Sequence, residues 1–455
     1  MNYNTLYMFK RDIIDALGKW AESPNRKPLI LRGARQVGKT TAVEQFAKKF
    51  EYFIKLNLDD DQQLSYFDPS LNIHQIIDTL FVEHKIPANH KRVLIFIDEI
   101  QNSGQAIKML RYFYEEKPEL FVIAAGSLLE TTLNNDVSFP VGRVEYLKMY
   151  PCNFREFLVA TGDEQILESL QQVPFPMHLH SILLHRFKSY SIIGGMPEVV
   201  VTYAQEKQIH SLSGIYDSLI VSFLDDVEKY ARNETLTKVI RHTIRHAFQS
   251  AGSRIKFQGF GASNYKNREI GEAFQLLQKA FVLQLVYPSV NTKLPLDVSI
   301  KRSPKLQMMD TGLVTYFSQA QKEMLLAKTI DDTFQGRMAE HIVGQEIQAL
   351  SNSPLAELHF WTRERADAEA EVDFIFQYDG KIFPIEVKSG ATGRLRSLFQ
   401  FVDRAPHPFA VRIYSGKLNV ENGNTPSKKP FKLLNLPFYL VHMLPKYLDW
   451  LVNEN

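Results

Sequence analysis

The chain carries at residues 33–41 the stretch Gly33-Ala34-Arg35-Gln36-Val37-Gly38-Lys39-Thr40-Thr41. Its first eight residues follow the pattern G-x-x-x-x-G-K-[ST], after an apolar run and before an amphipathic segment. Glycines let such a loop turn its backbone amides inward around phosphate groups, and the following helix dipole attracts an anion. The stretch therefore predicts a nucleotide site, with Lys39 at the β- and γ-phosphates and the Thr40 hydroxyl on magnesium.

Apolar runs alternate with amphipathic segments on both sides of this loop. The runs that we expect to be strands are 28–31, 52–58, 93–97 and 120–124. The segments that we expect to be helices are 39–50, 73–84 and 105–115. Apolar strands that alternate with helices indicate an α/β domain whose parallel sheet is covered on both faces.

Two carboxylates, Asp98 and Glu99, end the apolar run at 93–97. In a buried parallel sheet the carboxyl ends of the strands meet the ligand. We expect Asp98 to hold magnesium, directly or through water, and Glu99 to polarise the attacking water. The alternative is that both carboxylates cap the next helix. The run at 120–124 leads to Ser127, which is a candidate sensor of the γ-phosphate or an ordinary turn residue.

Composition limits the class of protein. The chain has 455 residues, of which 45% are hydrophobic and 23% are charged, and this suits about three globular domains rather than a disordered chain. The lone cysteine, Cys152, excludes an internal disulfide and a multi-cysteine zinc site. No apolar stretch approaches the roughly 20 residues of a membrane span, and the first residues lack a signal-peptide pattern. We therefore expect a cytoplasmic protein without a membrane partner.

Basic residues gather in the middle of the chain, although the net charge of the whole chain is only +2. Residues 229–268 contain nine Lys or Arg residues and one acidic residue, Glu234. Arg241, His242, Arg245 and His246 recur at helical spacing, so one helix face is expected to be basic. Residues 265–268 (Tyr-Lys-Asn-Arg) then precede an amphipathic segment at 269–280 and an apolar run, an order that resembles a winged helix. DNA is one partner consistent with such a basic module. The alternatives are a solvated face or a surface docked on acidic parts of the same chain.

A hairpin is predicted near the C-terminus, because Asp379-Gly380 is a strong two-residue turn signal. A turn there pairs Asp373 with Glu386, and Glu371 with Lys388, on one side of the hairpin. Directly opposed side chains have Cβ atoms roughly 5 Å apart, so the two acids Asp373 and Glu386 could share a divalent metal. The alternative is a hairpin held by a Glu371–Lys388 ion pair.

The sequence resembles prokaryotic AAA-type ATPases whose P-loop domain is fused to a C-terminal domain of unknown function. The matching stretches are LRGARQVGKT, VLIFIDEIQN, FVIAAGSLLE, PCNFREFL, IIGGMPEVV, LQMMDTGLVTYF, GRMAEHIVGQEI and EVDFIFQYDGKIFPIEVKSG. The resemblance implies ATP with Mg²⁺, a strand at 120–124 between the strands at 28–31 and 93–97, and a helical lid from near Pro151. It implies Lys39 and Thr40 at the nucleotide and metal, Asp98 at the metal, Glu99 as catalytic base and Ser127 as sensor.

Further features come from the same resemblance. Many AAA enzymes complete the site with an arginine from a neighbouring subunit, which makes the protein a candidate homo-oligomer, and Arg143 is the position that fits. An exposed arginine or an internal ion pair is the alternative for this residue. The C-terminal pattern is similar to a restriction-endonuclease-like core, with Glu340 as the helical acid beside Asp373, Glu386 and Lys388. A fold of this kind that has lost cleavage and only binds is a further alternative.

We expect four regions, namely an ATPase core at 1–150, a lid at 151–230, a winged-helix-like module at 231–325 and a nuclease-like domain at 326–455. Two outputs are open. In one, ATP drives a nucleic-acid enzyme whose basic module grips DNA and whose C-terminal site cuts it. In the other, ATP controls a switch that binds a protein partner and has no nuclease chemistry.

Overall fold

The computed structural model describes residues 9–89, 91–126, 140–229, 231–327, 336–363, 370–389 and 395–453. The chain divides into two compact units. The first unit comprises the described residues up to Tyr150 together with Lys279–Phe281 and Ser351–Leu355, and the second comprises the other described residues. Among the described residues, no helix is both long enough and apolar enough to cross a membrane.

The first unit is built on a five-stranded parallel sheet with the order β2-β3-β4-β1-β5. The strands are β1 (Leu29–Arg32), β2 (Tyr52–Asn57), β3 (Val93–Asp98), β4 (Phe121–Ala125) and β5 (Glu145–Lys148). Four of them coincide with the predicted apolar runs to within a residue or two. The order also has β4 between β3 and β1, so the strand order implied by the resemblance is confirmed.

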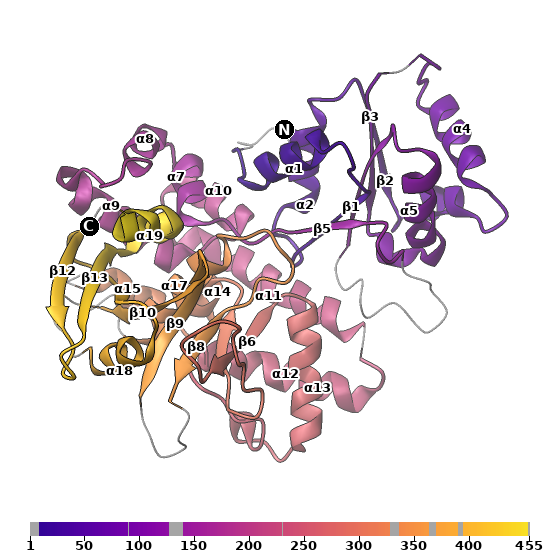
Figure 1. Ribbon diagram of the computed structural model, residues 1–455. Coiled ribbons are helices and arrows are strands. Elements are labelled where there is room, and N and C mark those ends of the chain that lie inside the picture. The colour runs from indigo at the N-terminus through magenta and orange to yellow at the C-terminus, as the bar shows by residue number, and fades with distance from the viewer. Residues whose placement is uncertain are drawn as a thin grey trace. The chain divides into compact units, whose positions relative to one another are not determined.

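Helices cover this sheet on both sides, as Figure 1 shows. They are α1 (Ile13–Glu22), α2 (Lys39–Ala47), α3 (Asp61–Leu64), α4 (Ile73–Glu83) and α5 (Gly104–Glu116). The apolar faces of α4 and α5 form one core with the strands. On the other side, Trp20 of α1 packs edge-on against Phe121 of β4. Strand β3 is buried along all its apolar residues, which explains its continuous rather than alternating hydrophobic pattern.

Helices open the second unit, as expected for residues 151–230. They are α7 (Phe154–Thr161), α8 (Leu167–Leu170), α9 (His180–Ile193), α10 (Pro197–Glu206) and α11 (Ser213–Glu228). The break between α9 and α10 has a physical cause. Gly194 adopts a φ of 78°, and an added Cβ there would lie 2.3 Å from a carboxylate oxygen of the buried Asp310. Pro197 then starts α10 at a position where its missing N–H costs nothing.

The next elements are α12 (Glu234–Gln249), α13 (Asn267–Lys279), β6 (Leu283–Ser289), β7 (Lys305–Met308), α14 (Thr311–Phe317) and α15 (Gln321–Leu326). Two helices followed by the antiparallel pair β6 and β7 give the element order of the predicted winged-helix-like module. However, β6 also pairs in parallel with β8 (His359–Thr362), so this module and the predicted C-terminal domain share one sheet. The sequence did not indicate this pairing, because it joins segments about 70 residues apart.

The shared sheet has eight strands in the order β12-β13-β11-β10-β9-β8-β6-β7. Its remaining strands are β9 (Glu371–Tyr378), β10 (Lys381–Lys388), β11 (Phe409–Tyr414), β12 (Asn419–Asn424) and β13 (Pro430–Pro437). The accompanying helices are α17 (Arg337–Gln348), α18 (Arg396–Arg404) and α19 (Leu444–Asn453). Leu398, Phe401 and Val402 of α18 pack with strand residues into one buried core.

The predicted hairpin turns at Asp379 and Gly380, whose φ angles are 43° and 70°. Two positive φ angles in succession are typical of the tight turns that match strand twist. The antiparallel pairing runs from Lys381↔Tyr378 to Ile385↔Phe374, which is the predicted register. The ladder was expected to continue through Asp373 and Glu386, but instead the Val387 N–H donates to the Asp373 carboxylate at 2.8 Å.

Candidate functional sites

The loop between β1 and α2 has the backbone that its glycines predict. Gly33 has a φ of 149°, and an added Cβ would lie 2.4 Å from the Met149 carbonyl oxygen. Gly38 has a φ of 92° and forms the N-cap of α2. These conformations exclude most side chains, so glycine is required at both positions. The loop therefore leads its backbone into the start of α2, where N–H groups attract anions.

The Lys39 ammonium lies over this loop. Its Nζ donates hydrogen bonds to the carbonyl oxygens of Gly33 at 2.9 Å and Ala34 at 2.8 Å. Both acceptors belong to the loop itself, so the side chain is held above the position where phosphates are expected. A bound phosphate would offer the same ammonium a charged acceptor in place of neutral carbonyls.

Thr40 and Asp98 are brought together, although 58 residues separate them in the sequence. The Thr40 hydroxyl donates to Asp98 Oδ2 at 2.6 Å. Thr40 lies in the first turn of α2 and Asp98 ends β3, so the contact lies at the carboxyl edge of the sheet. A hydroxyl and a carboxylate are oxygen ligands of the kind that Mg²⁺ prefers, so the two residues fit a magnesium ion.

Glu99 follows in a strained conformation, with φ 50° and ψ 41°. Its carboxylate accepts a hydrogen bond from Gln101 Nε2 at 2.6 Å. Gln101 lies on the short 3₁₀ turn Ile100–Asn102 and is only 8% exposed. Non-glycine residues with positive φ cost about 1–3 kcal/mol and tend to occur at functional positions. Sequence reasoning missed Gln101, because nothing in its spacing marks it as the partner of Glu99.

The Gln101 side chain is also confined by Gly126. An added Cβ on Gly126, just after β4, would lie 2.2 Å from Gln101 Oε1. That oxygen is buried, and no described residue forms a hydrogen bond with it. The Gln101 side-chain amide therefore lies between the end of β4 and the Glu99 carboxylate. Ser127, the predicted sensor next to Gly126, lies outside the described residues.

Arg143 lies just before β5, at the surface of the first unit. Its Nε forms an ion pair with Glu115 Oε1 at 2.8 Å, and Arg111 contacts the same carboxylate at 3.0 Å. Hydrogen bonds from Arg143 and then Arg111 lower the pKa of the Glu115 carboxyl. The internal ion pair, weighed as the alternative to a catalytic role, is thus present, and the catalytic role stays a prediction.

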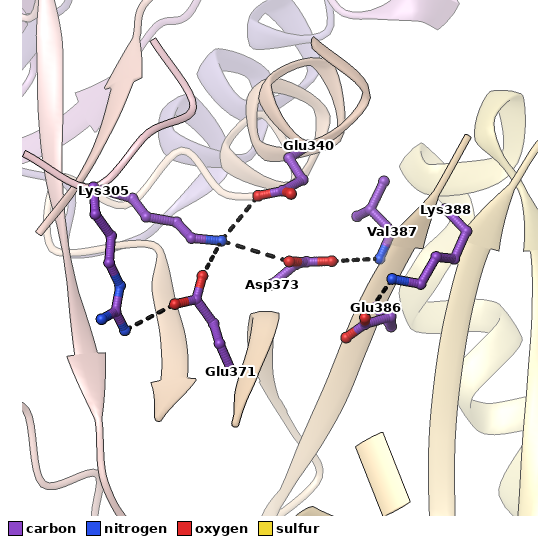
Figure 2. A network of polar contacts seen from close by, with 8 residues as sticks. Lys305, Glu340, Glu371, Asp373, Glu386, Val387 and Lys388 are labelled. Carbon is purple, nitrogen blue, oxygen red and sulfur yellow. Dashed lines mark hydrogen bonds and ion pairs between the residues drawn. The ribbon is translucent and has the colours of Figure 1, made fainter. Parts of the chain in front are cut away.

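The C-terminal acids surround a residue that the sequence did not indicate. Lys305, at the start of β7, lies 2.9 Å from Glu340, 2.7 Å from Glu371 and 3.5 Å from Asp373, measured from Nζ to the nearest carboxylate oxygen. Figure 2 shows the three carboxylates converging on this ammonium from α17 and β9. We call Lys305, Glu340, Glu371, Asp373 and Glu386 the carboxylate cluster.

The predicted Glu371–Lys388 ion pair is wrong. Glu371 pairs with Lys305 and, at 2.8 Å, with Arg254, whereas Lys388 pairs with Glu386 at 2.6 Å. Two cations from outside the hairpin thus take the place expected for Lys388. They were missed because Arg254 and Lys305 reach the hairpin only through the shared sheet.

Glu386 carries the least satisfied carboxyl of the cluster. It is 6% exposed, and within the part of the chain that the structure describes its Oε2 has no hydrogen-bond partner. Burial first, and then Asp373, raise the pKa of Glu386 to about 8. The same two causes raise the pKa of Glu340 to about 7. Carboxyls this strongly perturbed are typical of functional sites, although ion-pair networks produce them too. Within the described residues, no group of three or more His, Cys, Asp or Glu residues is arranged to hold a metal ion.

Most side chains on the expected basic face of α12 have partners within the chain. Arg241 pairs with Glu228 of α11, and Lys238 pairs with Glu234 one turn away. His242 contacts the Phe260 carbonyl oxygen at 3.0 Å and packs against His246. The face is therefore less basic than the sequence suggested, because Glu228 of the preceding helix pairs with Arg241. Arg245 remains on its exposed surface.

The comparison with known protein families agrees with the fold of the first unit. Residues 25–158 match a family described as an AAA domain. Residues 184–323 and 335–437 match two families described as domains of unknown function, DUF8612 and DUF4143. In this family match, its parallel sheet and its loop geometry, the first unit is similar to AAA-type P-loop ATPase domains. Neither of the other two families carries a described activity.

Two curated relatives share much of the chain. An uncharacterized protein of Methanocaldococcus jannaschii, MJ1637, is 22% identical over 356 residues, covering 74% of this chain and 71% of that protein. An uncharacterized protein of Haemophilus influenzae is 23% identical over 297 residues, covering 62% of this chain and 67% of that protein. The chain is thus similar to proteins whose names state no activity.

Solved structures give weak likenesses. The Aeropyrum pernix ORC1 protein in complex with DNA has a TM-score of 0.28 at 12% identity, covering 71% of this chain and 96% of that chain. C. elegans PCH-2 has a TM-score of 0.28 at 11% identity, covering 43% of this chain and 62% of that chain. Likeness at this level supports no functional inference.

Proposed function

We propose that the first unit binds ATP together with Mg²⁺ and hydrolyses it. The observation that carries the proposal is the 2.6 Å hydrogen bond between the Thr40 hydroxyl and Asp98 Oδ2, which joins the phosphate loop to the acidic strand end. A chance glycine-rich turn would have no reason to meet a carboxylate 58 residues away in sequence. The match of residues 25–158 to an AAA domain supports the same reading.

In this proposal each residue has a distinct task. Backbone N–H groups of residues 33–41 and the Lys39 ammonium bind the phosphates and stabilise the charge that develops in the transition state. Thr40 and Asp98 hold magnesium, which neutralises phosphate charge when bound. Glu99 orients a water molecule for in-line attack on the γ-phosphate and accepts its proton.

Nucleotide binding and turnover test the proposal separately. Lys39→Ala removes the phosphate cation, so we expect calorimetry to show loss of tight ATP binding. Glu99→Gln keeps the binding groups, so it should retain ATP while turnover falls by about 100-fold or more. Lys55→Ala is a matched control, because Lys55 pairs with Glu44 at the surface of the same unit. Wild-type turnover in Glu99→Gln would remove Glu99 as the base.

The output of the second unit is a separate proposal. The first alternative is metal-dependent cutting of nucleic acid by Glu340, Asp373, Glu386 and Lys388. The observation that favours it is the buried Glu386 Oε2 near Asp373, for which the described residues offer no hydrogen-bond partner. The second alternative is a nucleotide-controlled switch that binds a protein partner. The ion pairs on Lys305 favour it, because three of the acids already have a cation partner within the chain.

A nuclease assay with Mg²⁺ or Mn²⁺ separates the two outputs. Cutting of DNA or RNA by the wild type that is lost in Glu386→Ala supports the first. Absence of cutting by both proteins on single- and double-stranded substrates supports the second. DNA binding by the basic module is tested by a salt titration, since phosphate contacts weaken as salt rises. No affinity at low salt would dismiss DNA as a partner.

A further inference from the structure

Lys305 connects two regions that match different families. It lies in the region that matches DUF8612, whereas Glu340, Glu371 and Asp373 lie in the region that matches DUF4143. Strand β7 brings the lysine to the acids by pairing with β6, which in turn pairs with β8. The cation of the carboxylate cluster is therefore supplied from outside the helix and hairpin that carry the acids.

The lysine is held firmly. It is 7% exposed, and its Nζ lies within 3.5 Å of all three carboxylates. The ammonium also lies 5.3 Å from the centre of the Phe360 ring, which faces it as an aromatic surface. Burial lowers the pKa of Lys305, but Glu340, Asp373 and Glu371 outweigh burial and raise it overall. The side chain is therefore charged throughout the physiological pH range.

The lysine and a divalent metal ion exclude each other. A divalent ion held by these acids needs carboxylate oxygens at roughly 2.0–2.6 Å, in the space where they now surround the ammonium. A second cation in that space would also be repelled by the first. With Lys305 in place, the cluster therefore does not fit a divalent metal ion.

Glu386 shows that the cluster is nevertheless incompletely satisfied. Its buried Oε2 has no hydrogen-bond partner among the described residues. A buried carboxylate oxygen without a donor is costly, and a cation is the partner that would satisfy it. Lys305 satisfies Glu340, Glu371 and Asp373 but does not contact this oxygen within ion-pair distance.

We propose that Lys305 is a built-in occupant of the carboxylate cluster that takes the place of a divalent cation, and that Glu340, Asp373 and Glu386 bind such a cation only when the lysine is removed by substitution. This inference rests on the acids being a cation site, as in the first output above, and it does not depend on ATP hydrolysis.

Metal binding by the full-length protein without nucleotide tests the inference. The probe is Mn²⁺, titrated by calorimetry into wild type, Lys305→Met and the double variant Lys305→Met/Glu371→Gln. The double variant removes one acid along with the lysine, so it keeps the net charge of the cluster and leaves the three proposed ligands. Lys381→Met is the matched control, because Lys381 pairs with Asp379 at the hairpin turn.

We expect both Lys305 variants to bind Mn²⁺ at least tenfold more tightly than wild type and the control, and this gain to vanish when Glu386→Gln is added. Should Lys305→Met fail to fold, as judged by circular dichroism, the double variant gives the same comparison. Equal Mn²⁺ affinity of the wild type and the Lys305 variants would overturn the inference while leaving the acids as a cation site. Absence of binding by all proteins would overturn both.

Discussion

At the scale of single residues, Gln101 governs where the Glu99 carboxylate points. Its amide holds that carboxylate at 2.6 Å, and Gly126 leaves the amide no room to retreat. A proposed catalytic base that is hydrogen-bonded in this way is oriented by a group that need not touch the nucleotide. Gln101 is therefore a positioning residue in the proposed reaction.

Gln101→Ala should lower the kcat of ATP hydrolysis by about tenfold and leave KM nearly unchanged, since positioning a general base contributes only part of its effect. Asn102→Ala is the matched control, because Asn102 is the next residue and donates instead to Asp59 and to the Leu58 carbonyl oxygen. Steady-state kinetics with calorimetric ATP affinity provides the measurement. A purely structural role would lower the melting temperature of Gln101→Ala and weaken ATP binding along with kcat.

At the scale of elements, local patterns predicted the structure well. The parallel strands of the first unit and the hairpin register follow from apolar runs and turn residues that lie close together in sequence. The partners of the site residues did not follow. Lys305 reaches the acids, and Arg241 reaches Glu228, through tertiary packing that no short pattern encodes. The sequence allowed chemical roles to be predicted for individual residues. It did not indicate which residues are their ion-pair partners.

Gly33 lies in a tightly packed loop and Gly380 lies in an open one, so substitutions at the two positions can be compared. An alanine at Gly33 must adopt a φ of 149° and place its Cβ 2.4 Å from the Met149 carbonyl oxygen. Gly380 has a φ of 70°, but an added Cβ meets nothing within 4 Å. We expect Gly380→Ala to cost about 1 kcal/mol of stability through backbone strain alone and to leave ATP binding intact.

Gly33→Ala should both destabilise the first unit and abolish tight ATP binding, because its loop can relieve the clash only by moving. Thermal unfolding with and without ATP measures both effects. Tight ATP binding by Gly33→Ala would contradict the assignment of this loop to the phosphates. A loss of stability in Gly380→Ala that far exceeds the backbone cost would contradict the open environment of the hairpin turn.

At the scale of the whole molecule, the question is whether one chain completes the nucleotide site. Arg143 is exposed and pairs with Glu115, so it is available at the surface once that ion pair opens. An exposed ion pair contributes only about 0–1 kcal/mol, so a neighbouring subunit could draw the arginine away at little cost. If Arg143 acts in this way, its loss should lower turnover without weakening ATP binding.

Complementation between subunits tests the role of Arg143 directly. Lys39→Ala subunits lack the phosphate cation but keep Arg143, and Arg143→Ala subunits have the reverse defect. Each variant alone should be nearly inactive, and mixing them should restore part of the ATPase rate, because some sites then combine an intact loop with an intact arginine. Arg111→Ala is the matched control, since Arg111 shares Glu115 but is not the proposed catalytic arginine. Full activity of Arg143→Ala as a monomer would leave this residue with its ion pair and no part in catalysis.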